Sequence, residues 1–498
     1  MSNRTRYALS ALLAAASLSV AGPVSADVTI WGDVSPQNPT DPWDLGVTPL
    51  RVWNGAVEVT DGGTLISPGA SVQASDFGAI QIDGYGSTWI NTGSIEVGSI
   101  NNSEDSWIII RNGAEAVTDE LVVGLGGDRN HGSVLVEGYD ATLTSRATTY
   151  IGTKGNGSLE LKQGATFFSH DVYFGGGIGN SCGTCTGEAI ITGTATRWVS
   201  TGEFVLGMKS RGLLDIRNGQ LSTMNARITG DDHMHSRASV SGWGGTWTNQ
   251  GLLQVGSTSG YGTLTVGAYG TLLTEDTEIH SQLGGGFVKV SDVHASWLNS
   301  GDVTVFATGN QYPSLLVDKG ALVSIGGLLQ TAPMVSGYPY LGPSVRLADG
   351  DLIADAIQVV EGDFDFVGGR LETGSFVGDL ANMQAGELSV GEAHPSTAVA
   401  GSYSQGPGAT LRITVTGTSA LPLLQVDGDL NLDGALKVLP DDGSVSFQVG
   451  DTIALLGWSG GLTGTFAAVD IALPLGPGLT WDTSALYTTG EITVVPAA

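Results

Sequence analysis

VEVTDGGTLIS (57–67), SVLVEGYDATLTS (133–145) and SLELKQGATFFS (158–169) share one pattern. In each stretch, β-branched residues or leucines alternate with other residues, the chain turns at a glycine, and an apolar residue follows. The alternation is typical of β-strands and the glycine of a tight turn. Similar units begin at residues 57, 80, 108, 134, 159, 189, 213, 238, 263, 287 and 314, so ten intervals over 257 residues give a period of about 26.

A repeat of this length predicts a solenoid with one coil per unit. Stacked coils satisfy each strand's backbone with its two neighbours, whereas independent hairpins would leave many open edges. We therefore expect an all-β protein, a right-handed parallel β-helix over residues 27–400. An irregular loop is expected near 331–350, where Pro333, Pro339 and Pro343 fall, and residues 401–498 are expected to form a C-terminal β cap module.

The composition limits the classes of partner. The 498 residues include 76 glycines, only 14% are charged, and the formal net charge is −29. An excess of carboxylates makes nucleic acid and anionic membranes poor partners. The hydrophobic content of 41% is too high for a disordered acidic tail, and no internal run is long and apolar enough to predict a transmembrane segment in the mature protein.

The first 26 residues have the pattern of a secretory signal peptide. Arg4 and Arg6 provide a positive start, residues 8–20 are apolar, and Val24-Ser25-Ala26 is a small-residue cleavage site. We expect a mature chain that begins at Asp27 and is secreted, either to the extracellular space or to the cell surface.

Four tryptophans share one place in the repeat. The stretches GYGSTWINTGSIEVG (84–98), GTATRWVSTGEFVLG (193–207), GWGGTWTNQGLLQVG (242–256) and ASWLNSGDVTVF (295–306) contain Trp89, Trp198, Trp247 and Trp297. Leu143 takes this place in GYDATLTSRATTYIG (138–152), which indicates a need for apolar bulk and favours a core position. An external aromatic ladder that stacks on sugar rings stays open as the alternative.

These recurring motifs over 50–330 resemble the repeats of bacterial autotransporter passengers and PEP-CTERM-associated exported proteins. The last hundred residues, among them LLQVDGDLNLDGALKVL (423–439), resemble the closing β module of such proteins in planctomycete-like bacteria. The resemblance implies an exported surface or matrix protein. The family's usual C-terminal sorting helix does not follow Val495-Pro496-Ala497-Ala498, which favours release or non-covalent attachment to the surface.

Cys182 and Cys185 lie in the longest interval between units, which predicts a loop inserted into the solenoid. A tetrahedral zinc site needs two further ligands, and a redox-active pair opens a helix that this pattern lacks. We expect a local disulfide in an oxidising compartment.

Two stretches raise the question of metal binding. Asp429, Asn431 and Asp433 begin like an EF-hand loop, but Pro440 occupies the twelfth position, where a glutamate is needed. The run Asp231-Asp232-His233-Met234-His235 could place alternate histidines on a metal, although a solvated turn is the expected interpretation. No cofactor or metal is predicted, and weak calcium binding stays open.

Two further motifs raise the question of catalysis. Ser459 lies in a G-x-S-x-G pattern, but a strand rather than the required helix is expected after it. Glu361, Asp363 and Asp365 alternate with phenylalanines on one expected strand, where they could form an acid–base row or a solvated face.

The sequence therefore predicts a non-enzymatic structural or adhesive β-solenoid that presents loops to cell-surface or matrix components, possible polysaccharide partners included. The alternatives are a carbohydrate-active β-helix enzyme, such as a polysaccharide lyase or glycoside hydrolase, and a calcium-stabilised matrix protein.

Overall fold

The computed structural model describes residues 27–37, 39–73, 77–98, 106–126, 131–176, 185–230, 235–257, 260–280, 285–306, 314–332, 345–360, 362–441 and 445–497. The described chain is all-β without a helix, and its parallel strands stack as a β-solenoid of about 14 turns. The predicted parallel β-helix architecture is thereby confirmed.

The chain divides into two compact units. The first contains the residues up to Gly251 together with a short piece around Tyr261, and the second contains most of the chain from Leu252 onward. The boundary between the two units falls within the strands β23 (Thr246–Val255) and β24 (Tyr261–Val266).

The first unit holds the remaining early strands, which are β1 (Asp27–Ser35), β2 (Trp43–Asp44), β3 (Leu50–Thr60), β4 (Thr64–Ser67), β5 (Ala70–Val72), β6 (Gly78–Asp83), β7 (Thr88–Asn91), β8 (Ser94–Val97), β9 (Ser106–Arg111), β10 (Glu115–Thr118), β11 (Glu120–Val123), β12 (His131–Glu137), β13 (Thr142–Ile151), β14 (Asn156–Lys162), β15 (Thr166–Phe174), β16 (Thr186–Thr192), β17 (Arg197–Ser200), β18 (Glu203–Leu206), β19 (Arg211–Arg217), β20 (Gln220–Thr223), β21 (Asn225–Ile228) and β22 (His235–Ser241).

The second unit holds the later strands, which are β25 (Thr271–Ile279), β26 (Gly286–Ser291), β27 (Ser296–Asn299), β28 (Val303–Phe306), β29 (Leu315–Asp318), β30 (Leu322–Ala332), β31 (Val345–Leu347), β32 (Asp351–Val359), β33 (Phe364–Val377), β34 (Leu380–Val390), β35 (Thr397–Ala400), β36 (Tyr403–Gln405), β37 (Thr410–Val415), β38 (Leu424–Val426), β39 (Leu430–Leu432), β40 (Ala435–Pro440), β41 (Thr452–Ala454), β42 (Leu456–Trp458), β43 (Leu462–Gly464), β44 (Ala468–Ile471), β45 (Leu479–Asp482) and β46 (Glu491–Pro496).

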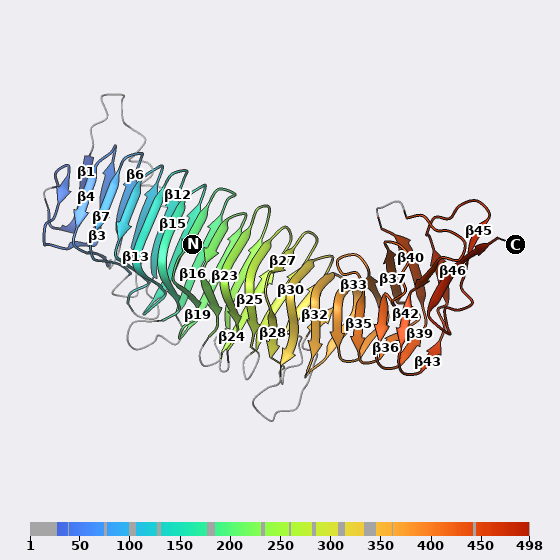
Figure 1. The fold of residues 1–498 in the computed structure, drawn as a ribbon. Coiled ribbons are helices and arrows are strands. Elements are labelled where there is room, and N and C mark those ends of the chain that lie inside the picture. Colours follow the sequence, from blue (N-terminus) through green and yellow to red (C-terminus); the bar gives the residue numbers. More distant parts are fainter. Residues whose placement is uncertain are drawn as a thin grey trace. The chain divides into compact units, whose positions relative to one another are not determined.

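The strands of successive turns lie side by side and pair in parallel (Figure 1). Some turns have one long strand in place of two short ones, as β13 pairs with both β10 and β11. In the first unit, β6 pairs with β9, β7 with β10, and β8 with β11, all in parallel. Because side chains alternate along a strand, every second residue enters the interior and the others face outward. The burial pattern of β7 and β8 shows this alternation, which is the one read from the sequence.

The interior residues of successive turns stand in columns. One column, which we call the Trp column, runs along the second strand of each turn and is buried throughout the first unit. Its members there are Trp43, Leu65, Trp89, Ala116, Leu143, Phe167, Trp198, Leu221 and Trp247. In the second unit, the same kind of column contains Leu272, Trp297, Val323, Leu352, Leu371, Leu388, Leu411 and Leu436.

The ends of the described chain depart from the parallel pattern. The strand β1 runs antiparallel to β3, and β41, β45 and β46 form a small antiparallel sheet. Parallel pairing continues past residue 400, since β36 pairs with β34 and β44 pairs with β40. The region 401–498 thus contains further solenoid turns as well as the antiparallel sheet.

The stretch expected to be an irregular loop near 331–350 is only partly described. The strand β30 ends at Ala332 and β31 begins at Val345, while residues 333–344 lie outside the described residues. The ladder resumes across this stretch, because β31 pairs with β29 before it and with β33 after it.

Candidate functional site

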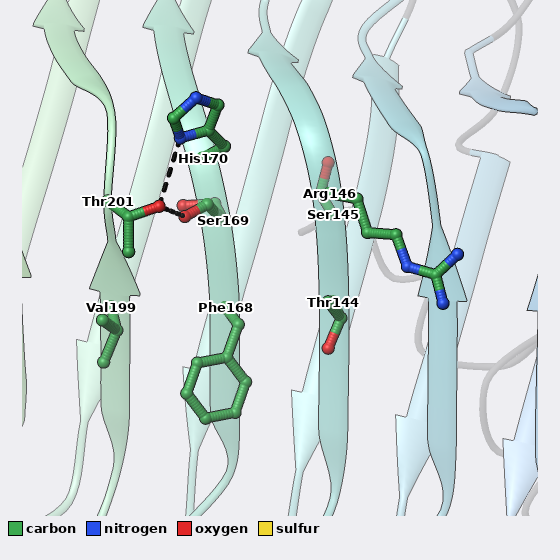
Figure 2. Close-up of a pocket in the computed structure, with 8 residues that line it drawn as sticks. All are labelled: Thr144, Ser145, Arg146, Phe168, Ser169, His170, Val199 and Thr201. Carbon is green, nitrogen blue, oxygen red and sulfur yellow. Dashed lines mark hydrogen bonds between the residues drawn. The ribbon is translucent and has the colours of Figure 1, made fainter.

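A groove of about 390 Å³ opens on the outer surface of the first unit. It crosses three adjacent strands, β13, β15 and β17, which belong to successive turns. Figure 2 shows its lining residues, which are Thr144, Ser145, Arg146, Phe168, Ser169, His170, Val199 and Thr201.

One end of the groove is apolar. Thr144, Phe168 and Val199 stand in register on the three strands and face outward, because each follows a buried member of the Trp column. Phe168 is 44% exposed as a residue, whereas phenylalanine is usually among the most buried residue types. This end offers a ring face and methyl groups to a ligand.

The other end is polar. His170 Nδ1 lies 3.1 Å from Thr201 Oγ1, and Thr201 Oγ1 also donates to the Ser169 carbonyl over 3.4 Å. Arg146 lies beside it and pairs with Asp119 over 3.6 Å, with both side chains largely exposed. None of the eight lining residues is a carboxylate, so the lining does not supply the paired acids of glycoside hydrolysis. The lining can make ring contacts and hydrogen bonds with a ligand.

The four repeat tryptophans lie inside the solenoid. Trp89, Trp198, Trp247 and Trp297 are each at most 1% exposed. Their indole N–H groups donate to a hydroxyl of the preceding turn, namely Ser67, Ser169, Thr223 and Thr274, over 2.8–3.0 Å. Their ring faces are therefore not offered to sugars, and burial supports the core interpretation over the external ladder.

The sequence reasoning missed the asparagine that follows three of these tryptophans by two residues. Asn91 accepts a hydrogen bond from Ser67 and donates to the Gly93 carbonyl, each over 2.8 Å. Asn249 and Asn299 repeat this arrangement in their own units. The W-x-N spacing in TWIN, TWTN and SWLN was the available signal. This spacing identifies an asparagine that is buried at a corner of the turn. Its side chain is hydrogen-bonded there, as buried polar groups generally are.

The structure describes only one of the two cysteines that we expect to form a disulfide. Cys185 is fully buried and is part of a disulfide. Cys182 lies outside the described residues, so its pairing with Cys185 stays a prediction.

The described residues of the two metal-binding candidates have other structural surroundings. Leu430 and Leu432 are interior residues of β39, so Asn431 faces outward from a strand and does not belong to an EF-hand loop. Asp429 instead accepts the Gly461 N–H over 2.7 Å. Of the histidine-rich run, only His235 is described, and its ring stacks on Tyr261 at 4.2 Å. Within the described ranges, no group of three or more His, Cys, Asp or Glu side chains is placed to hold a metal ion.

The described residues of the two catalytic candidates lie in strands or next to them. Ser459 is followed by the strand β43, and not by the helix of a nucleophile elbow. Asp365 pairs with Arg346 over 3.2 Å, and Asp363 is exposed, while Glu361 lies outside the described residues.

The second unit contains an ionic cluster that the sequence reasoning did not predict. The fully buried carboxylate of Glu372 on β33 pairs with Arg370 over 2.6 Å and accepts the His394 N–H over 3.3 Å. Glu392 binds Arg370 and also Arg412, the latter over 2.6 Å. Burial alone lowers the pKa of Arg370, but its hydrogen bond to Glu372 and the carboxylates of Glu392, Glu372 and Asp351 outweigh this and raise the pKa. The cluster holds the loop 391–396 against the outer surface, and we call it the loop clamp.

A pair of outward tyrosines lies near acidic residues. Tyr150 and Tyr173 stack with ring centroids 5.7 Å apart, and the Tyr173 hydroxyl donates to Glu203 over 3.0 Å. Burial and the bond to Glu203 raise the pKa of Tyr173 to about 12.

Glu58 on β3 is a partly buried carboxylate with a raised pKa. Burial and the nearby carboxylate of Asp83 raise the pKa of Glu58, although Arg111 acts in the opposite direction. A raised carboxyl pKa means that the folded state holds the proton more tightly than the unfolded state. The resulting stabilisation is present below the unfolded pKa and is lost as pH rises through the folded pKa.

We therefore expect Glu58→Gln to raise the free energy of unfolding at pH 7 relative to the native chain and to give no gain at pH 4. Urea unfolding at the two pH values measures this difference. The Gln81 amide, which donates to Glu58 over 3.0 Å, can donate equally to the new amide oxygen. A gain at pH 4 that equals the gain at pH 7 would show that burial of the charge is not the cause.

No protein-family model matches the chain, and no curated protein matches it. No helix among the residues that the structure describes has the length and apolar character needed to cross a bilayer.

Proposed function

We propose that this chain is an exported, non-enzymatic β-solenoid whose outer surface makes contacts with cell-surface or matrix components, polysaccharides among them. The observation that carries the proposal is the parallel pairing of successive turns around a filled core. In such a scaffold each turn is held by its neighbours, so its outward side chains can vary without loss of the fold.

Two observations support export. Residues 1–26, which lie outside the described residues, have the sequence pattern of a signal peptide. Cys185 is disulfide-bonded, and structural disulfides persist in oxidising compartments. The repeat motifs lead us to propose a relationship to autotransporter passengers and PEP-CTERM-associated exported proteins.

A binding screen on the mature chain tests the proposal. We expect retention on at least one insoluble polysaccharide or matrix protein, with a dissociation constant that is unchanged by EDTA and without release of soluble sugar. Release of sugar would contradict the non-enzymatic part and favour a carbohydrate-active enzyme. A thermal midpoint that rises with Ca²⁺ and falls with EDTA would favour a calcium-stabilised matrix protein. Retention on none of the surfaces would contradict the adhesive role.

A further inference from the structure

In the first unit, the turns that precede the Trp column alternate between two lengths. Short turns such as Asn112-Gly113 and Gln163-Gly164 begin with a non-glycine residue at positive φ. The long turns of this unit begin with a glycine at positive φ, as at Gly84 and Gly138, and carry one additional residue at the tip. Every second turn of the first unit is therefore one residue longer at its tip than its neighbours.

Aromatic residues occupy the tips of three long turns in the first unit. Tyr85, Tyr139 and Trp243 are 85%, 73% and 71% exposed, respectively. Each comes four residues before a member of the Trp column, in GYGSTW, GYDATL and GWGGTW. The long turn between the second and third of these has Thr194 in the corresponding place.

Each tyrosine rests on a glycine of the next short turn. A Cβ atom at Gly113 would lie 3.2 Å from Tyr85 Cδ2, and one at Gly164 would lie 2.7 Å from Tyr139 Cδ1. The second distance is shorter than real side chains allow, so the glycine is what admits the ring. One side of each tyrosine thus lies against main chain, which orients the ring, while most of the side chain stays exposed to solvent.

The spacing of these residues follows the solenoid. Tyr85 and Tyr139 are two turns apart, which corresponds to about 9.6 Å along the stacking direction. Trp243 lies four turns beyond Tyr139. A partner that contacts successive members must itself be extended and must present flat apolar faces at regular intervals.

A polysaccharide has these properties. The C–H face of a pyranose ring stacks on an aromatic ring, and a two-turn interval is comparable with the length of a disaccharide unit in an extended chain. The chain has 49 acidic and 20 basic residues, and this negative charge disfavours binding of a polyanionic polysaccharide. The carboxylate of Asp140, next to Tyr139 in the chain, can accept hydrogen bonds from sugar hydroxyls.

We propose that Tyr85, Tyr139 and Trp243 form an external aromatic ladder that binds a neutral polysaccharide along the stacking direction of the first unit. This inference rests on the proposed adhesive function and names both its surface and its ligand class. It places the ladder on the turns and not on the buried repeat tryptophans.

The test compares the full chain with the double variant Tyr85→Ser/Tyr139→Ser in pull-down on cellulose, chitin, insoluble β-glucan and insoluble starch. We expect at least a tenfold loss of affinity for the neutral polymer that the native chain binds. The variant Tyr85→Phe/Tyr139→Phe should retain binding, because it keeps the ring faces. Trp31→Ser is the matched control for an exposed aromatic residue of the same unit away from these turns, and it should bind like the native chain. Circular dichroism and protease resistance report whether each variant folds.

Several outcomes would overturn the inference. Binding that the double variant retains but Phe168→Ser loses would place the saccharide in the groove of Figure 2. Stronger binding to pectate than to neutral polymers would contradict the ligand class. Self-association of the native chain in sedimentation that the double variant loses would make a second copy the occupant. If the native chain binds a matrix protein but no polysaccharide, the ladder fails while the adhesive function stands, and if it binds nothing, both fail.

Discussion

Trp198→Ala should lower the free energy of unfolding by about 3–5 kcal/mol, the usual cost of truncating a buried aromatic residue. The indole is almost fully buried and has ring-centroid distances of 5.0 Å to Phe167 and 5.3 Å to Phe204. Its removal leaves a cavity and also leaves the buried hydroxyl of Ser169 without the indole donor. Urea unfolding gives the loss of stability.

The damage should be local at first. Each turn of a solenoid contacts only its neighbours, so stability is close to a sum over adjacent turns. Hydrogen exchange should therefore accelerate in β15, β17 and β18 at denaturant concentrations that leave more distant turns protected. Uniform acceleration over the whole chain would instead show that the solenoid unfolds as one cooperative unit.

Two control variants show whether the loss of stability comes from lost packing in the core or from the loss of an aromatic ring as such. Trp198→Leu should cost less than Trp198→Ala, because Leu143 and Leu221 occupy the same column in the same unit. Tyr85→Ala removes a mostly exposed ring and should change stability by no more than about 0.5 kcal/mol. Equal losses for Trp198→Ala and Tyr85→Ala would contradict the assignment of the Trp column to the core.

Glu372→Ala should be the most damaging substitution of a charged residue in the second unit. Removing one partner of a buried ion pair costs about 3–5 kcal/mol, and a value near 3 is expected here because the Arg370 side chain is 26% exposed. The substitution also removes the acceptor of the Ala393 and His394 N–H groups. The loop 391–396 should then become accessible to proteases.

The isosteric variant Glu372→Gln tests whether charge or shape holds the loop. Its amide oxygen can accept the backbone N–H groups but cannot neutralise Arg370, so we expect an intermediate loss of stability. Asp365→Asn is the control for a more exposed pair, since Arg346 and Asp365 are partly solvated, and it should cost less than about 1 kcal/mol. A loss for Glu372→Ala as small as that of Asp365→Asn would show that the loop clamp does not stabilise the unit.

The period of about 26 residues, the strand alternation and the turn glycines were sufficient to predict a parallel solenoid. They suffice because the fold is built from local units, and each unit meets only its neighbours. The core place of the repeat tryptophans was also predictable, since Leu143 takes the same place in its own unit. Ala116 shows that the column also contains a small apolar residue.

The sequence alone could not distinguish inward from outward aromatic residues. Phe167 and Phe168 are neighbours of equal hydrophobicity, yet the first is fully buried and the second is 44% exposed. Only the register of β15 between its neighbouring strands decides which of them enters the core, because a shift of one residue exchanges the two faces.

Contacts between turns were likewise beyond the sequence. Glu372 reads as a solvated charge on an outward position of a strand, but the loop 391–396 folds back and buries it. Tyr139 and Gly164 are separated by 25 positions in the chain and meet only because consecutive turns stack. Sequence periodicity thus determined the scaffold, since it encodes local alternation and turns, whereas the tertiary structure decided the loop clamp and the aromatic tips, which depend on contacts between residues of different turns.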